Sequence, residues 1–441
     1  MNLLQKFFAI LGIDKSILWA SSSRIIPLML GPVGSIIVVF TLSPREQGTY
    51  YLFLSLLALK AFFDLGASAA IAQMTPHLKA PPDENGATRR IDPEFVFVAT
   101  RLIRLIATVF GIVCGVVGVA YLIWTGESQP HILVMWICTV AVTALGGSIE
   151  GHTQIVYGLG NVDEVSKMRL VGVFIQYPVQ WILLLAGASL FSFVASILAV
   201  FLWQLSFLRR RHPYVWEKSR PPCARQSEIR AELAALVKRA SLTYVSGFLV
   251  FQVQQPIIFK YLGPEESARL GFTNMIGATL IGLAAMWSVT SFPRYASKVA
   301  DGRIEDGFAD FKRTWSRTIV IATLGMGAAL TAILIFKQFP RFDERLMSLS
   351  AALPLFAAIW MQQTASAATF WPRSFKKEPF AVIALTQMVV TPLAVFLCVR
   401  SFGLLGVGLG NTVSWMVGAT GIIWISKSYF PKRNTAIAAV N

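Results

Sequence analysis

Charged residues are scarce in this sequence. They make up 14% of the 441 residues, whereas 55% are hydrophobic, and the mean hydropathy is +0.60. A soluble domain usually carries roughly a quarter charged residues. The shortage of charge therefore excludes an ordinary water-soluble globular protein and indicates a chain that lies within a membrane.

Cysteine and histidine are also few, with four of each. The cysteines have no C-x-x-C spacing and the histidines form no ligand pattern, so neither a disulfide nor a metal site is predicted. The sequence has no Gly-Lys dipeptide, which excludes a Walker A loop and an ATP-driven pump in this chain. We expect no enzyme activity, no catalytic residue and no cofactor; a proton or sodium gradient as the energy source stays open.

Long apolar runs are what the sequence has in abundance. Twelve of them are long enough to cross a bilayer as helices. They cover residues 17–41, 48–72, 102–124, 131–156, 168–188, 191–208, 239–262, 269–292, 317–337, 346–370, 380–400 and 404–426. The connections are short, and even the longest, 209–238, is too small for a soluble domain. The prediction is an all-α membrane protein with twelve transmembrane helices.

The basic residues indicate how these helices are oriented. Most of the 39 Lys and Arg residues fall in every second connection, including the run Arg209–Arg211. The positive-inside rule places those connections, and with them both termini, in the cytoplasm. The formal net charge of +16 then follows topology, and no nucleic-acid partner is expected.

The two halves of the chain echo each other. The segment Leu42-Ser43-Pro44-Arg45-Glu46 follows the first span, and Leu262-Gly263-Pro264-Glu265-Glu266 follows the seventh. With six spans in each half, the echo favours a duplicated transporter whose repeats are parallel. We expect an N-lobe at 1–208, a cytoplasmic linker at 209–238 and a C-lobe at 239–441.

Charged residues inside the spans are the first candidates for a site. Lys60 and Asp64 lie one helical turn apart in the second span, Arg24 lies in the first and Glu150 in the fourth. Such residues are costly in lipid and normally face a bundle interior or a wet cavity. We expect Lys60 and Arg24 to be cavity cations and Asp64 and Glu150 to form a supporting ion network. A purely structural network of all four is the alternative.

Amides are the second set of candidates, and they gather in the second half. They are Gln252, Gln254, Gln255, Asn274, Gln362, Gln363, Gln387 and Asn411. Hydrogen bonds between helices account for most such amides. The sharper hypothesis is a glycan-binding wall made by Gln252, Gln255, Gln362 and Asn411, close to Trp287, Trp360 and Trp415.

Small residues in the spans predict close helix packing. One set is the alternating glycines Gly406, Gly408 and Gly410 in the last span, and the other is the G-x-x-x-G pair Gly111 and Gly115 in the third. We assign no ligand to either set.

The start of the chain resembles a known family. L-x-P-x-E-x-G-x-Y at Leu42–Tyr50, followed by F-x-D-L-G at Phe62–Gly66, is similar to Wzx-type polysaccharide flippases. These belong to the superfamily that also holds the MATE exporters and the lipid II flippases. The resemblance implies two six-helix lobes in a bacterial inner membrane. The implied cargo is an oligosaccharide on undecaprenyl diphosphate, moved from the cytoplasmic to the periplasmic leaflet by alternating access.

The resemblance also implies partners, namely membrane lipids and the polymerase and glycosyltransferases of surface polysaccharide synthesis. A MATE-like cation-coupled exporter of drugs or metabolites is the main alternative. Such exporters tend to hold acids in the cavity, whereas here the cations Arg24, Lys60, Arg104 and Lys260 outnumber the two acids in the spans. A membrane-bound glycosyltransferase or polymerase is a further alternative, and the lack of a large outer loop in the sequence argues against it.

Overall fold

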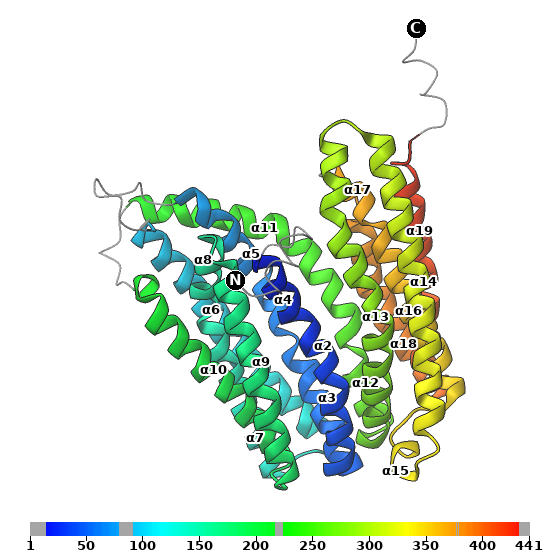
Figure 1. The fold of residues 1–441 in the computed structure, drawn as a ribbon. Helices are drawn as coiled ribbons and strands as arrows, with labels where there is room; N and C mark the ends of the chain where they lie inside the picture. The colour runs from blue at the N-terminus through cyan, green and yellow to red at the C-terminus, as the bar shows by residue number, and fades with distance from the viewer. Residues whose placement is uncertain (1–14, 79–90, 217–223, 376, 378, 432–441) are drawn as a thin grey trace, which may run out of the picture. The chain divides into compact units, whose positions relative to one another are not determined.

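The computed structural model describes residues 15–78, 91–216, 224–375, 377 and 379–431. In this part of the chain every regular element is a helix (Figure 1). Each of the twelve predicted spans coincides with a helix or with two or three helices in succession. The all-α prediction is confirmed.

The first six spans and the segments around them form the following elements. They are α2 (Lys15–Thr41), α3 (Pro44–Leu57), α4 (Lys60–Asp64), α5 (Ala67–Met74), η1 (Thr75–Leu78), α6 (Pro93–Thr125), α7 (Pro130–Ser148), α8 (Glu150–Gly158), α9 (Val162–Leu185), α10 (Phe191–Arg211) and η2 (Pro213–Trp216). The second half comprises α11 (Ala224–Gln252), α12 (Gln254–Tyr261), α13 (Pro264–Ala300), α14 (Ile304–Phe336), α15 (Pro340–Asp343), α16 (Leu349–Ala368), α17 (Phe370–Ser374), α18 (Ala381–Phe402) and α19 (Leu405–Lys427).

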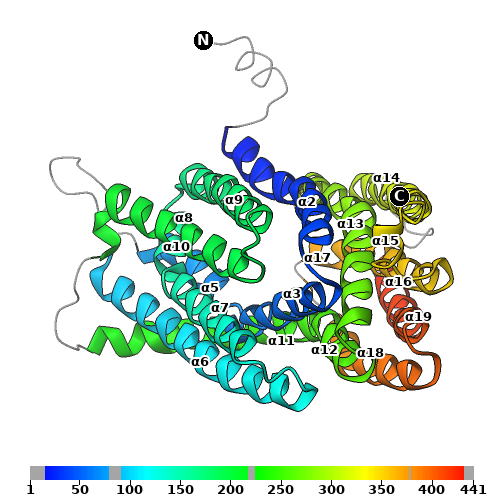
Figure 2. The same ribbon diagram turned by 90° about the horizontal axis from the view of Figure 1, so that it is seen from below.

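The chain divides into two compact units. Unit 1 holds the described residues of Met1–Glu46 and Phe53–Phe248, and unit 2 holds Gln47–Leu52 together with the described residues of Leu249–Asn441. Within unit 1, α2 packs on α9, α6 on α7, and α10 on both α7 and α9. Within unit 2, α13 packs on α14, and α19 lies against both α16 and α18 (Figure 2).

Seven described helices or helix pairs are long and apolar enough to cross a membrane, or eight if the bent segment from α3 to η1 counts as one span. The seven are α6, α7 with α8, α9, α10, α13, α14 and α18. The other predicted spans, α2, α11 with α12, α16 and α19, are helical but are not among these seven; in α2 the apolar stretch Ile26–Thr41 is shorter than the others. Three of these four carry the amides of the second half, and these amides lower the mean hydropathy of the helices.

The second span is broken in two places rather than straight. Leu65 (φ 49°) and Gly66 (φ 80°) both adopt the left-handed conformation between α4 and α5, and the span bends by 45°. The Asp64 carboxylate accepts hydrogen bonds from the Ser68 hydroxyl at 2.7 Å and the Ser68 backbone N–H at 3.3 Å. Asp64 therefore satisfies the first turn of α5, which explains the F-x-D-L-G segment as a capped helix break.

Each of the two echo segments begins a helix with a proline. Pro44 is at the first position of α3 and Pro264 at the first position of α13, where a missing N–H costs nothing. Ser43 and Glu46 form a reciprocal capping box at α3. At α13 the capping residue is Gly263, which has a positive φ of 95°.

The glycines of the last span pack as predicted. A Cβ added at Gly406 or Gly410 would lie 2.2 Å from Cys398 O or 2.6 Å from Val395 Cα, which are backbone atoms of α18. A Cβ at Gly408 would lie 2.7 Å from the backbone of α16. The prediction for the third span is only half right. Gly111 faces Ala144 of α7, but a Cβ at Gly115 would meet nothing within 4 Å.

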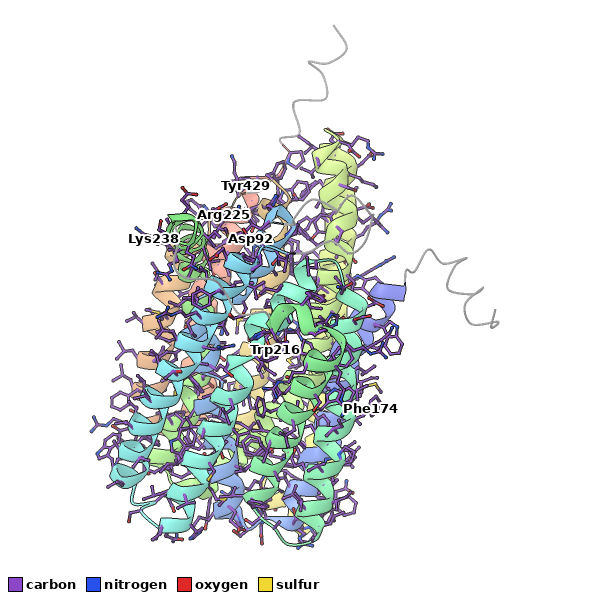
Figure 3. The ribbon with its side chains drawn as sticks, turned by 90° about the vertical axis from the view of Figure 1, so that its left-hand side faces the viewer. Asp92, Phe174, Trp216, Arg225, Lys238 and Tyr429 are labelled. Carbon is purple, nitrogen blue, oxygen red and sulfur yellow. The ribbon has the colours of Figure 1, made fainter. Side chains whose placement is uncertain are left out.

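The amino-terminal half of α11 is an amphipathic helix that packs on unit 1. Ile229 and Leu233 are buried in the core cluster of this unit. Arg225 pairs with Asp92 at 2.8 Å, just before α6 (Figure 3). Nearby, His212 is buried between the Glu164 carboxylate at 2.9 Å and the Tyr214 hydroxyl at 2.9 Å. Burial lowers the pKa of His212, although the Glu164 carboxylate acts in the opposite direction.

Candidate functional site

Unit 2 contains a cavity of about 240 Å³ between its helices. Five elements line it, namely α11, α12, α13, α16 and α19. The lining residues are Gln252, Gln254, Asn274, Ala278, Leu355, Ala358, Ile359, Gln362, Gln363, Asn411 and Trp415. Six of these eleven are amides, which is an unusual concentration of polar groups within membrane-spanning helices.

A helix break positions two of the amides. Pro256 has no backbone N–H, so the helical hydrogen bond to the Gln252 carbonyl cannot form, and its ring crowds that carbonyl. The helix is interrupted there at Val253, between α11 and α12. Gln252 and Gln254, on either side of the interruption, both line the cavity. Broken helices at membrane depth are tolerated where they line a cavity and often mark binding sites.

Two of the amides hold the wall in place. Gln254 donates to the Asn411 side-chain oxygen at 2.8 Å, and the Asn411 amide nitrogen donates to the Val407 carbonyl at 2.8 Å. This ties α12 to α19. Asn411 thus lines the cavity while both ends of its amide are engaged by the protein, which makes it a positioning residue.

Gln255 is placed differently from its neighbours. Its side-chain nitrogen donates to the carbonyl and hydroxyl oxygens of Ser267 at 2.6 and 2.7 Å, and it is not among the residues that line the cavity. Continuous helical spacing puts Gln252 and Gln255 on one face. The interruption at Val253 changes that register, so Gln255 braces α12 against α13.

Three lining amides have no partner among the residues that the structure describes. Asn274, Gln362 and Gln363 form no hydrogen bond with another described residue. Each amide offers two N–H donors and one acceptor oxygen. The sequence shows Asn274 and Gln363 as amides, but nothing local distinguishes them from Gln387, which hydrogen-bonds Ser414 and Thr391 within the α18–α19 contact.

The cavity is uncharged, and several of its lining residues lie well inside their helices. No Asp, Glu, Lys, Arg or His is among its lining residues. Along their helices, Asn274 is about 15 Å from Pro264, Asn411 about 9 Å from Leu405 and Gln362 about 20 Å from Leu349. In a hydrocarbon layer about 30 Å thick, these positions are deep. Trp415, 8% exposed, adds an aromatic surface from α19.

Unit 1 presents the isolated cation Lys60. It is the first residue of α4, at the first break of the second span, and is half-buried. Its chain lies over Gly147 of α7, where an added Cβ would come within 3.2 Å of Lys60 Cε and 3.6 Å of Nζ. Lys60 forms no ion pair or hydrogen bond with a described residue, Asp64 included.

Of the other three predicted charges, Asp64 and Glu150 are engaged elsewhere. Arg24 is on α2, and its side chain lies outside the described residues. Asp64 bonds Ser68. Glu150 pairs with Arg169 of α9 at 3.0 Å and accepts a hydrogen bond from Gln154 at 2.6 Å. Arg169, at the edge of the fifth span, is the partner that sequence reasoning missed.

No family model and no curated protein matches this chain. Several solved structures resemble it. An inward-facing multidrug resistance MATE family transporter of the MOP superfamily has a TM-score of 0.64 and 16% identity, over 97% of this chain and 100% of that one. The lipid II flippase MurJ, in an inward closed conformation, has a TM-score of 0.67 and 12% identity, over 93% and 87%. A MATE structure in a bent conformation has a TM-score of 0.56 and 15% identity, over 94% and 93%.

These similarities define the fold. The chain is a multi-pass membrane protein with the twelve-helix fold of the MATE transporters, and the MurJ flippase shares much of this fold. The MATE-like fold that the resemblance at Leu42–Gly66 implied is therefore confirmed.

Proposed function

We propose that this protein flips an oligosaccharide linked to undecaprenyl diphosphate from the cytoplasmic to the periplasmic leaflet of a bacterial inner membrane. It does so by alternating access, in the synthesis of a cell-surface polysaccharide. The proposal combines the Wzx-like segments Leu42–Tyr50 and Phe62–Gly66 with the site geometry. The polymerase and glycosyltransferases that make and extend this cargo are the proposed partners.

The amide-lined cavity of unit 2 carries the proposal. A glycan presents many hydroxyl groups, each a donor and an acceptor, and unengaged amides in an uncharged cavity complement them. The isolated cation Lys60 in unit 1 supplies positive charge for the diphosphate, with Arg24 as the second proposed cation. In this role Asp64 supports the site by closing the helix break, and Glu150 by holding Arg169.

A cation-coupled exporter is the second candidate, because multidrug transporters share the fold. Cationic cargo requires an acidic group that is available to it. The described acids within the spans of unit 1 are engaged, Asp64 by Ser68 and Glu150 by Arg169, and the cavity of unit 2 has no acid. This distribution favours the anionic, glycosylated cargo.

Reconstitution tests the function directly. Purified protein is placed in liposomes that carry a fluorescent undecaprenyl-diphosphate oligosaccharide, and lectin added outside reports the accessible fraction. We expect this fraction to rise from about half to nearly all of the lipid, with protein-free liposomes unchanged. Unchanged accessibility, accompanied by gradient-driven uptake of a cationic dye, assigns the protein to the exporter class instead.

Topology is testable by thiol labelling in a variant without the four native cysteines. With both termini in the cytoplasm, Ser128→Cys and Glu265→Cys lie outside and react with an impermeant maleimide in intact cells. Asp306→Cys reacts only after permeabilisation. All three side chains are exposed, whereas the neighbouring Glu127 is 3% exposed and pairs with Arg45. The opposite labelling pattern reverses the orientation and the proposed direction of transport.

A further inference from the structure

The charge and size of the cavity in unit 2 restrict what it accepts. We propose that this cavity binds one uncharged sugar residue of the cargo and discriminates against acidic sugars. The inference rests on the proposed function, and it adds the chemical class of the sugar and the residues that select it.

The three unengaged amides are the contact groups. Asn274, Gln362 and Gln363 come from α13 and α16, so a ligand between them meets donors and acceptors from two helices. Their position in the membrane makes an unfilled hydrogen bond costly, and a hydroxyl-rich ring fills several at once. Trp415, on α19, offers the apolar surface that the C–H face of a pyranose requires.

The absence of charge decides the selectivity. A uronate or sialate brings a carboxylate, and moving an ion into a site without a countercharge costs several kcal/mol before any contact is made. None of the lining residues is a cation, and the protein's own hydrogen bonds engage both ends of the Asn411 amide. The lining residues can therefore donate amide hydrogen bonds to the carboxylate, but they provide no positive charge to balance it.

The volume limits the ligand to a single ring. The cavity of about 240 Å³ is smaller than the 300–1,000 Å³ usual for drug-sized ligands. A cavity of this size suits one monosaccharide ring. The remaining sugars of the cargo lie elsewhere.

Saturation-transfer NMR on the purified full-length protein tests this selectivity, because it detects weak binding. The probes are methyl α-glucopyranoside, methyl N-acetyl-α-glucosaminide and sodium methyl glucuronoside. We expect at least one neutral probe to bind and the glucuronoside to bind at least tenfold more weakly than it. Gln363→Leu, which removes an unengaged amide, should weaken the neutral probe about three- to tenfold.

A charge-introducing variant makes the test reciprocal. Gln362→Lys places a cation of similar length in the cavity and should raise the affinity for the glucuronoside at least tenfold relative to the neutral probe. Gln73→Lys makes the same change at an exposed glutamine of α5 and should leave the wild-type preference unchanged. Equal binding of the charged and neutral probes to wild type overturns the inference, as does the absence of neutral binding.

The two proposals fail separately. If the neutral probe binds selectively but the lipid-linked oligosaccharide does not flip in liposomes, the proposed function is wrong and the sugar-selective cavity stands. If the oligosaccharide flips while the glucuronoside binds as tightly as the neutral probe, only the selectivity is wrong.

Discussion

Lys60→Met is expected to abolish flipping of the lipid-linked oligosaccharide, lowering its rate at least a hundredfold, while the protein still folds. The substitution keeps the side-chain length that packs over Gly147 and removes only the charge. Because Lys60 has no ion-pair partner among the described residues, its charge is available to a diphosphate. The rate is measured in the liposome assay, and Lys60→Arg, which keeps the charge but changes the shape, should retain part of it.

Stability separates this role from a structural one. Removing an unpaired cation from a membrane-spanning segment should leave the apparent melting temperature unchanged or raise it. Asp64→Ala should lower it, because the loss of a capping carboxylate costs about 0.5–2 kcal/mol. The matched control is Lys167→Met on α9, which removes a lysine paired with Asp163 and should flip at the wild-type rate. Full activity of Lys60→Met would falsify the cationic role.

Gly410→Ala is expected to lower the stability of the protein substantially, because this glycine lies against the backbone of α18. The added Cβ would lie 2.6 Å from Val395 Cα and 2.7 Å from Val395 N, so α18 and α19 must move apart. Overpacking of this kind costs typically 1–3 kcal/mol, and backbone atoms cannot rotate away as a side chain does. The apparent melting temperature in detergent should fall by several degrees. It is measured from the fraction of protein that stays monodisperse after heating.

The same change in open space should act in the opposite direction. Gly115→Ala on α6 adds a Cβ that meets nothing within 4 Å. Alanine favours helix over glycine by about 0.5–1 kcal/mol, so this variant should be as stable as wild type or slightly more stable. If both variants lose the same amount of stability, the loss in Gly410→Ala does not come from the close approach of α18 and α19, and the prediction is wrong.

The sequence predicted which types of residue form the candidate site, but it did not predict how they are arranged in space. The amides Gln252, Gln362 and Asn411 stood out because polar side chains are rare in spans, and all three line one cavity. Gln255 could not be separated from Gln252 by helical spacing, since the interruption at Val253 shifts the register between them. Gln363 and Asn274 were among the amides of the spans, but only the packed helices show that they form no hydrogen bond with another described residue.

The charges show the same division. Glu150 was recognised as a costly intramembrane acid, but its partner Arg169 belongs to the next helix along the chain. Asp64 was expected in an ion network and instead bonds Ser68 across the left-handed pair Leu65 and Gly66. Whether a charge is neutralised depends on the rotation of neighbouring helices, which span composition does not encode.

The MATE-like fold class was indicated by a resemblance to a known family, whereas the sequence by itself determines the twelve helical spans and the Pro-led helix starts at Pro44 and Pro264. These follow from local physics, because a backbone in lipid must satisfy its hydrogen bonds within each helix and proline acts on its own turn. Only the tertiary structure decides which amides remain unengaged, which glycines meet a backbone and that Lys60 has no counter-ion among the described residues. Those properties depend on contacts between residues as far apart as Gln254 and Asn411, which exist only after the helices have packed.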